Sequence, residues 1–386
     1  MLTGWQEIKN GSEWHWYYFI TEKDITGMEQ KGHMALGWIK IKGLWYYLKE
    51  ESEAGYMVTG WREIKGKWYY FKTKEEAKNG TDYGYMFSDT WLKYKGKWYY
   101  FDKNGEMITS KLITWKGKKY FLKTDGSMAV NETVVDPITN KTYKADKDGV
   151  CREIKNGVIT VALSDSARFV EILDGSTTYY GGDQAWYNWA GDSQKTAVAQ
   201  GGGCGTVAAA NIVAYLAKHN VQYSALYSHP DYTKTNFLLH MEEMYEYVTP
   251  RNIKNEPIGV WPISVMKNGV KRFATDKGIE INAVRGNNSF NRETVVEYIK
   301  EGLEQDSPVA MLMGMSGSNS VSITYPNGAV AGNNSFSLHW VTITELEIDE
   351  INDTAKVKVS SWGGWSEVDL DEYMSEPLYQ GLVYFV

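Results

Sequence analysis

Cys204 occupies a position where a thiol readily becomes a nucleophile. Residues 200–218 read QGGGCGTVAAANIVAYLAK, a glycine-rich loop that leads into an alanine-rich helix with Cys204 at the junction. Free backbone N–H groups and the helix dipole stabilise a thiolate at such a junction. The glycines would let a substrate carbonyl approach backbone N–H groups that act as oxyanion donors. We therefore predict that Cys204 is a catalytic nucleophile, the alternative being a buried cysteine that packs as a small apolar residue.

A nucleophilic thiol needs a base, and His339 is the best candidate. It lies in residues 337–344, SLHWVTIT, where strand alternation places it on the same inward face as Val341 and Ile343. A core histidine with satisfied hydrogen bonds is the alternative. The other histidines of this half have other expected roles. His219 ends the helix that follows Cys204, His229 precedes a proline, and His240 lies in the helical run 237–247.

The spacing of these residues resembles that of papain-like cysteine peptidases. Cys204 and His339 are 135 residues apart (339 − 204), within the ~130–150 typical of that family. Residues 359–365, VSSWGGW, are similar to the Asn-Ser-Trp-Gly segment in which the asparagine orients the histidine and the tryptophan shields it from water. Residues 157–386 therefore resemble a papain-like domain, closest to the bacteriocin-leader peptidases. CHAP-type and NlpC-type wall hydrolases usually have a much shorter Cys–His separation.

The resemblance also implies a third catalytic group and an oxyanion donor, and both depart from the family pattern. Ser360 stands at the position of the asparagine and is a weaker acceptor for a charged imidazole. Strand parity places Ser361, rather than Ser360, on the face of Val357 and Val359. Gln200, the candidate oxyanion donor, precedes Cys204 by four residues instead of the usual six.

The chemistry that follows is acyl transfer to Cys204, with His339 acting first as base and then as acid, followed by hydrolysis. We expect a peptide or protein substrate. No metal or organic cofactor is implied, because no His/Cys/Asp cluster has ligand spacing. A peptidoglycan amidase or endopeptidase that uses the same pair remains open, as does a non-enzymatic wall-bound adhesin with a vestigial pair.

Aromatic repeats fill the first part of the chain. Residues 37–47 read GWIKIKGLWYY, and the pattern returns as GWREIKGKWYYF at 60–71 and as WLKYKGKWYYF at 91–101. A first copy, which carries an insertion, begins at Trp5, and a last copy at Trp115 lacks the second tryptophan. Each copy predicts a β-hairpin, with Lys-Gly or Asn-Gly at a turn that requires positive φ. A single hairpin cannot bury its own face, so the copies are expected to stack into a solenoid.

These repeats resemble the choline-binding and glucan-binding repeats of Gram-positive surface proteins, over roughly 1–150. The resemblance implies that tryptophans of one hairpin and an aromatic residue of the next surround a quaternary ammonium group, which is attracted to the ring faces. The wall ligand would be a choline-bearing teichoic acid or a glucan. For each tryptophan, packing of the solenoid is the alternative role. The candidate ligand-binding residues are Trp38, Trp45, Trp61, Trp68, Trp91 and Trp98.

Length and composition favour two domains. A chain of 386 residues exceeds the usual size of one hydrophobic core. Tryptophans thin out and helical periodicity begins near 150–157, so we expect a multidomain protein: a β-hairpin solenoid of aromatic repeats at 1–150 and an α+β papain-like domain at 151–386. Two cysteines give no disulfide framework, although one bridge is left open. Cys151, in the turn-like segment 148–151, is interpreted as structural.

Charge and hydropathy exclude several classes of partner. Residues 1–155 carry 26 Lys+Arg against 21 Asp+Glu, and the remainder 15 against 27, or +5 and −12. Scattered basic residues and an acidic second half argue against nucleic acid, and no apolar run reaches the ~20 residues of a membrane span. Met1 opens directly on repeat sequence. We therefore expect a secreted, cell-wall-associated protein whose signal peptide has been removed.

Overall fold

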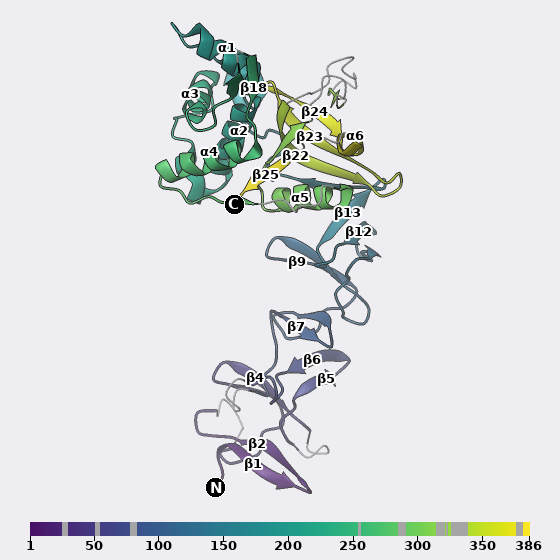
Figure 1. Cartoon of the computed structure of the whole chain (residues 1–386). Coiled ribbons are helices and arrows are strands. Elements are labelled where there is room, and N and C mark those ends of the chain that lie inside the picture. The colour runs from purple at the N-terminus through teal and green to yellow at the C-terminus, as the bar shows by residue number, and fades with distance from the viewer. Residues whose placement is uncertain are drawn as a thin grey trace. The chain divides into compact units, whose positions relative to one another are not determined.

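The chain forms two compact units, Met1–Glu153 and Ile154–Val386, in the computed structural model (Figure 1). The division falls three residues beyond the boundary at 150 that composition predicts. The structure describes residues 1–24, 30–50, 55–77, 83–253, 256–284, 291–313, 321, 323–325, 339–375 and 381–386.

Five antiparallel hairpins build most of the first unit, each from one copy of the aromatic repeat. Short, aromatic and β-branched runs favour strands, and each pair is closed by a tight turn. The hairpins are β1 (Gly4–Asn10) with β2 (Glu13–Phe19), β3 (Gly37–Ile41) with β4 (Leu44–Leu48), β5 (Gly60–Ile64) with β6 (Lys67–Phe71), β7 (Thr90–Tyr94) with β8 (Lys97–Phe101), and β9 (Lys111–Trp115) with β10 (Lys118–Leu122). A shorter pair follows, β11 (Thr133–Val135) with β12 (Thr142–Ala145).

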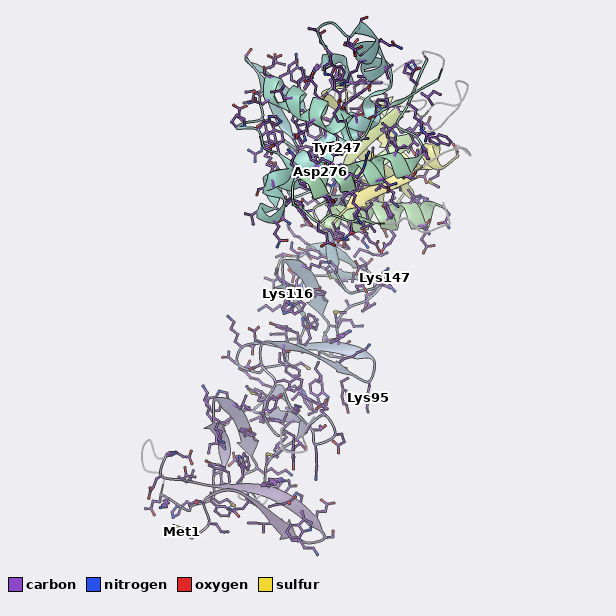
Figure 2. All side chains as sticks on the ribbon, turned by 60° about the vertical axis from the view of Figure 1, so that its left-hand side comes forward. Met1, Lys95, Lys116, Lys147, Tyr247 and Asp276 are labelled. Carbon is purple, nitrogen blue, oxygen red and sulfur yellow. The ribbon has the colours of Figure 1, made fainter. Side chains whose placement is uncertain are left out.

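The two-residue turns have the backbone conformation predicted from their Lys-Gly sequence. Lys42 and Gly43 have φ of 50° and 86°, and Lys95 and Gly96 have 47° and 80°. Positive φ at both central residues matches the right-handed twist of the flanking strands. The side chain of Lys95 is labelled at its turn in Figure 2. The hairpin prediction is therefore confirmed at the level of the turn.

A methionine connects each hairpin to the next repeat. The backbone N–H of Met86 donates to the carbonyl of Trp45 (2.7 Å), and that of Met107 donates to the carbonyl of Trp68 (2.8 Å). The Met107 side chain fills the space beside Gly126, where an added Cβ would meet its sulfur at 2.5 Å. Because each repeat completes the one before it, the stack is stable only as a series, as expected for a repeat array.

The second unit is a mixed α+β domain built around an antiparallel sheet. Its long strand β22 (His339–Asp349) pairs with β20 (Val309–Met313) and β14 (Val158–Ala162) along one edge and with β23 (Thr354–Ser361) along the other. The further strands extend this sheet through β20 and β23. They are β14 (Val158–Ala162), which also pairs with the end of β13 (Cys151–Lys155), β20 (Val309–Met313), β25 (Gly381–Phe385), β19 (Ala283–Val284), β23 (Thr354–Ser361), β24 (Gly364–Asp369) and β21 (Ile323–Thr324).

Helix α2 (Cys204–His219) is the central element of this unit, and its first thirteen residues are all buried. It packs against β22 and β20 and against the helices α3 and α4 (Figure 1). Outside the sheet, the described residues of this unit form two hairpins, β15 (Glu171–Asp174) with β16 (Thr177–Tyr180) and β17 (Arg251–Ile253) with β18 (Glu256–Gly259). The remaining helical elements are η2 (Gln184–Trp186), α1 (Ser193–Gly202), η3 (Val221–Leu226), α3 (Lys234–Tyr245), α4 (Ile263–Asp276), α5 (Arg292–Glu304) and α6 (Leu370–Ser375).

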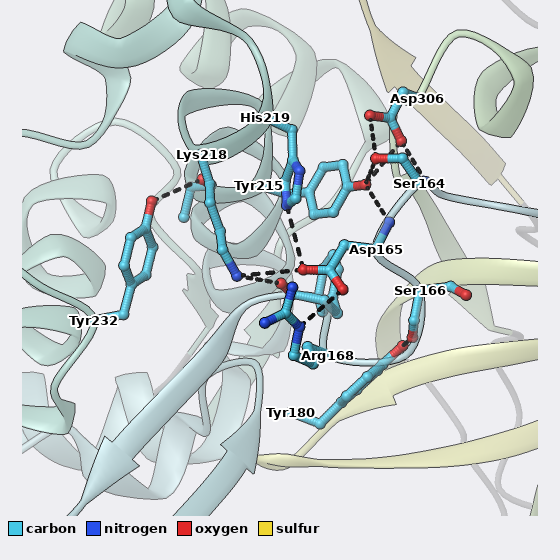
Figure 3. Close-up of polar contacts among 12 residues, drawn as sticks. Ser164, Asp165, Ser166, Arg168, Tyr180, Tyr215, Lys218, His219, Tyr232 and Asp306 are labelled. Carbon is cyan, nitrogen blue, oxygen red and sulfur yellow. Dashed lines mark hydrogen bonds and ion pairs between the residues drawn. The ribbon is translucent and has the colours of Figure 1, made fainter. Parts of the chain in front are cut away.

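A charged cluster holds the carboxyl-terminal end of α2 (Figure 3). Asp165 lies 3.7 Å from Lys218 and 3.9 Å from His219, the last two residues of the helix. Lys218 places a positive group near the negative end of the helix dipole, which is stabilising, whereas burial lowers the pKa of His219. His219 also stacks on Tyr215, with ring centroids 4.2 Å apart. His219 therefore has the helix-end role that the sequence predicts. At 1.5 Å per residue it lies about 22 Å from the other end of α2, where Cys204 begins the helix.

Candidate functional site

Cys204 is the first residue of α2, and its side chain is 6% exposed. Burial raises the pKa of its thiol, while backbone N–H groups of Trp340, Gly205 and Cys204 itself act in the opposite direction. Burial is the largest of these effects, so the group is a thiol rather than a thiolate near neutral pH. A nucleophile in this state needs a base that removes its proton during attack.

The glycines around Cys204 serve packing, which differs from the sequence interpretation. An added Cβ on Gly202 would lie 3.1 Å from the backbone nitrogen of Gly259. On Gly205 it would lie 2.5 Å from Val260 and 2.8 Å from the ring of Trp340. Gly202 and Gly205 are therefore required by close packing against hairpin β17–β18, Val260 and Trp340, a role that the sequence interpretation did not include.

His339 begins β22 and lines the same pocket as Cys204. This pocket has a cavity volume of about 10 Å³, which is room for about one water molecule. The strand prediction for 337–344 holds from His339 onward, and residues 337–338 lie outside the described part of the chain. The pocket is lined by Gln184, Cys204, Val207, Ala208, Asn211, His339, Trp340, Thr342, Ser360, Ser361 and Trp362.

The imidazole of His339 is neutral in this environment. Burial lowers its pKa from 6.5 to about 3, because a charged ring loses its hydration inside the protein. Nε2 lies 2.7 Å from the hydroxyl oxygen of Ser361. The indole of Trp362 covers the ring, with centroids 4.6 Å apart. The predicted shielding tryptophan is therefore next to the histidine.

Ser361, and not Ser360, is the serine that contacts His339. The hydroxyl of Ser360 donates instead to the carbonyl of Tyr180 at 2.6 Å and lies 3.5 Å from the amide nitrogen of Asn211. Strand alternation explains the difference, since adjacent residues of β23 point to opposite sides. The assignment of Ser360 as the orienting group is thus corrected to Ser361, the residue that strand parity favours.

Buried contacts hold the turn that carries Ser361 and Trp362. The amide oxygen of Asn211 on α2 accepts from the backbone N–H of Gly182 at 2.9 Å. The carbonyl of Gly182 in turn accepts from the N–H of Gly363 at 3.1 Å. These hydrogen bonds join helix α2 to the 180–182 segment and to the β23–β24 turn. They therefore fix Ser361 and Trp362, which contact the imidazole, relative to the helix that begins at Cys204.

Gln200 does not reach the pocket. It is exposed, and its side-chain nitrogen donates to the carbonyl of Tyr187 at 2.7 Å. Gln184 lines the pocket instead, and its side-chain nitrogen donates to the carbonyl of Gln200 at 2.7 Å. The position of Gln200 thus does not support the oxyanion role predicted for it, and the glutamine that lines the pocket is Gln184. Its position twenty residues before Cys204 matches no spacing rule, so the sequence offered no signal for it.

Cys151 has the structural role expected of it. Neither cysteine is in a disulfide. The Cys151 side chain is 4% exposed in the first unit, and its sulfur lies 3.7 Å from the carbonyl oxygen of Gly149. Burial raises the pKa of this thiol to about 11.

In the repeats, the six candidate tryptophans form three similar aromatic corners. The rings of Trp61 and Trp68 have centroids 6.3 Å apart at 73°, and Tyr99 of the next hairpin lies 5.1 Å from Trp61. These three residues, with Met107, line a pocket of about 690 Å³. Two equivalent corners join Trp38 and Trp45 to Tyr69, and Trp91 and Trp98 to Tyr120.

A fourth corner was missed in the sequence. Trp5 and Trp16 have centroids 6.5 Å apart at 81°, and Tyr46 lies 5.1 Å from Trp5. The insertion in this copy hid its similarity to the other three. The strand register makes the similarity clear, because Trp5 pairs with Tyr18 as Trp38 pairs with Tyr47. We define the aromatic corners as the four sets that share this geometry. They are Trp5/Trp16/Tyr46, Trp38/Trp45/Tyr69, Trp61/Trp68/Tyr99 and Trp91/Trp98/Tyr120.

Comparison with known proteins identifies the repeats. Residues 35–80 and 88–132 match the choline-binding repeat family, and both segments lie within the first unit. The chain thus carries choline-binding repeats, which indicate a cell-wall-associated surface protein. Among the described residues, no helix is long and apolar enough to cross a membrane. A comparison with curated proteins gives no match.

Several solved structures are similar over part of the chain. Choline-binding protein F from Streptococcus pneumoniae, solved in the presence of a peptidoglycan analogue, is 32% identical over 39% of this chain and 40% of its own, with a TM-score of 0.30. CbpJ from the same species is 27% identical over 46% and 50%, with a TM-score of 0.31. The choline-binding domain of Spr1274 is 29% identical over 25% and 95%, with a TM-score of 0.19. The chain spans about two fifths of the length of choline-binding protein F.

Proposed function

We propose that this protein is a wall-bound cysteine hydrolase, most simply a papain-like peptidase, in which Cys204 attacks an acyl group and His339 transfers the proton. The observation that carries this proposal is the shared pocket of Cys204 and His339, with Ser361 and Trp362 against the imidazole. A thiol at a helix start, an imidazole on a strand and a group that orients the imidazole form the arrangement that nucleophilic catalysis requires.

The first half of the reaction forms a thioester. Since Ser361 holds Nε2 of His339, Nδ1 is the ring nitrogen that takes the proton of the Cys204 thiol. The sulfur attacks the carbonyl carbon, and backbone N–H groups at the start of α2 stabilise the developing oxyanion. His339 then gives the proton to the leaving nitrogen, and the C–N bond breaks.

The second half releases the acid product. A water molecule enters, and the pocket has a cavity volume of about 10 Å³ for it. His339 takes a proton from this water, the oxygen attacks the thioester carbon, and the C–S bond breaks. The proton returns to the Cys204 sulfur. Both steps use a neutral imidazole as the starting base, which is the form that burial favours.

We propose further that each aromatic corner binds the trimethylammonium group of choline on teichoic acid. Ring faces that meet at 73° to 89° leave a concave angle where one cation contacts both rings. Cation–π attraction contributes about 0.5–2 kcal/mol per ring, so a single corner binds weakly. Several corners on one polymer give a much higher apparent affinity. The repeats would thus hold the second unit at the wall.

One digestion experiment tests the enzymatic proposal. Purified choline-bearing walls and a proteome-derived peptide library are incubated with wild type and with the Cys204→Ala variant, and new termini are identified by mass spectrometry. Cleaved library peptides that require Cys204 support the peptidase. Muropeptides released from walls without peptide cleavage would replace it by an amidase or endopeptidase. No product from either substrate, together with wall binding, would favour an adhesin.

Ser361→Ala is expected to lower turnover about fivefold, because it removes one neutral hydrogen bond to the imidazole, worth ~1 kcal/mol. Ser360→Ala is the matched control. It removes a contact with the Tyr180 carbonyl, so it should lower the free energy of unfolding by about 1 kcal/mol and leave turnover within about threefold. Turnover on a cleaved peptide and urea unfolding of each variant measure both effects. A larger turnover loss for Ser360→Ala would reverse the assignment.

The acidic limb of the kcat/KM profile is expected well below pH 6.5. Only a neutral His339 can accept the thiol proton, and burial holds its pKa at about 3. The base therefore stays available as the pH falls from 7, and activity is lost only toward pH 3. Peptide cleavage is measured from pH 4 to 8, with circular dichroism to confirm folding at each pH. A half-activity point near pH 6.5 in folded protein would contradict the buried, neutral base.

A further inference from the structure

Three metal-ligand groups converge at a place that the catalytic proposal does not use. His229, His240 and Glu243 each offer one ligand atom, and these atoms lie within 4.8 Å of one another. One polar side-chain atom of each residue is also buried, namely Nε2 of His229, Nδ1 of His240 and Oε2 of Glu243. None has a hydrogen-bond partner in the part of the chain that the structure describes. Buried polar atoms are rarely left this way, so the convergence needs an explanation.

Two elements bring these ligands together. His240 and Glu243 are three residues apart on α3, so they share one face of the helix. His229 comes from the segment that precedes α3, and its ring lies 6.1 Å from that of His240 at 77°. His240 is 0% exposed. Glu243 and His229 are partly buried.

Each α3 ligand is oriented by a second contact. Nε2 of His240 lies 3.2 Å from the carbonyl oxygen of Ala210 on α2. A carbonyl only accepts, so Nε2 carries the hydrogen and Nδ1 keeps its lone pair. Oε1 of Glu243 is held by the ammonium group of Lys277 at 2.5 Å, and Oε2 is buried without a hydrogen-bond partner among the described residues. Metal-binding histidines and carboxylates are commonly oriented in this way.

Direct pairing does not explain the cluster. Among the described residues, no hydrogen bond or ion pair within 4.0 Å joins Glu243 to either histidine, and the carboxylate pairs with Lys277 instead. One ligand atom of each residue lies within 4.8 Å of the others, without a direct hydrogen bond between them. Ligands of a tetrahedral ion with bonds of 2.0–2.2 Å lie about 3.3 Å apart, so a small inward movement of each side chain would complete the coordination.

We propose that His229, His240 and Glu243 bind one Zn²⁺ ion, with water as the fourth ligand. Two imidazole nitrogens and one carboxylate oxygen are a ligand set that suits zinc. The ion fixes the 227–233 segment to α3 and, through the hydrogen bond from His240 to Ala210, supports α2. Ala210 is not among the residues that line the Cys204 pocket. The role is therefore structural, and it is independent of the proposed hydrolysis.

Zinc binding is measured on the full chain in a Cys204→Ala background, so that the thiol and His339 cannot chelate the metal together. Protein treated with EDTA and dialysed is titrated with ZnCl₂ against a chromophoric chelator, and melting is followed at zinc about 100 times the Kd. We expect one Zn²⁺ per chain and a melting temperature higher by about 5 °C or more. Cobalt in place of zinc should give a tetrahedral visible spectrum without a thiolate charge-transfer band.

His229→Gln and Glu243→Gln are expected to weaken zinc binding by about 100-fold or more and to abolish the melting shift. His219→Gln is the matched control, because His219 is the histidine held by Asp165 at the end of α2, and it should change neither. His229 is partly exposed, so its substitution should leave a folded protein, which circular dichroism checks. The proposal is overturned if zinc does not bind, or if the His229→Gln and Glu243→Gln proteins bind it as tightly as the control.

Discussion

Cys204→Ala is expected to remove essentially all hydrolysis, by about 10³-fold or more, while the protein stays folded and bound to the wall. The sulfur forms the covalent intermediate, so without it the thioester cannot form and the catalysed reaction cannot proceed through that intermediate. The change removes one buried atom, and its cost in stability is expected to be modest. Release of cleaved peptides measures the first effect, and circular dichroism the second.

Cys151→Ala is the matched control for this experiment. Its thiol is also buried and also has a raised pKa, but it lies in the first unit. Its substitution should leave hydrolysis unchanged. Activity of the Cys204→Ala protein above a tenth of wild type would reject Cys204 as the nucleophile.

Removing the second tryptophan of every aromatic corner is expected to weaken binding to choline-bearing walls by about 100-fold or more. Each corner contributes little binding free energy alone, but several corners that bind one polymer raise the apparent affinity together. Removing one ring from every corner therefore lowers that affinity much more than removing a single ring would. Three of these rings are 39–42% exposed, so their truncation should cost little stability. The combined variant replaces Trp16, Trp45, Trp68 and Trp98 by alanine, and wall pull-down and choline titration by tryptophan fluorescence measure the effect.

Trp14→Ala is the control for this set. Trp14 is 62% exposed on β2 and lies outside the aromatic corners. Its loss should leave wall binding within about twofold of wild type. Equal binding by wild type and the combined variant would contradict choline recognition by the corners. If the protein binds an α-glucan and choline does not change its tryptophan fluorescence, the ligand of the repeats is a carbohydrate rather than choline.

The repeats were predictable because their information is local. A Lys-Gly pair between aromatic runs specifies a two-residue turn, and Lys42 and Gly43 adopt it. The third wall of each corner comes from the next repeat, as Tyr99 does for Trp61. The resemblance to choline-binding repeats implied that the next hairpin contributes an aromatic residue, but not which one. The fourth corner was hidden because an insertion changed the spacing between Trp5 and Trp16.

The candidate active site was predictable only in part, since its residues are joined through tertiary contacts. Cys204 and His339 were found from a helix start and a strand, and they do line one pocket. Alternation along β23 distinguished Ser361 from Ser360, whereas family position alone selected the wrong serine. Gln184 reaches the pocket because η2 lies against α1, and no spacing rule contains that packing.

The ligand cluster shows a similar limit. His240 and Glu243 have the i, i+3 spacing of two ligands on one helix face. This pair alone is common on helices, and the third ligand, His229, is brought to it by the turn before α3. The sequence therefore gave no reason to expect a metal, and only the unpartnered buried atoms of the structure do.

The most direct test of the Cys204–His339 pair is the rate at which Cys204 is alkylated in wild type and in His339→Ala. Iodoacetamide labelling near neutral pH is followed for each cysteine by peptide mass spectrometry, with buried Cys151 as the internal reference. Both thiols have raised pKa values, so a neighbouring base is expected to speed the labelling of Cys204, and the His339→Ala variant separates this effect from that of the helix start. We predict that Cys204 reacts at least about tenfold faster than Cys151 in wild type, and that His339→Ala removes this advantage. Labelling of Cys204 that is no faster than that of Cys151, or that is unchanged without His339, would contradict the pair.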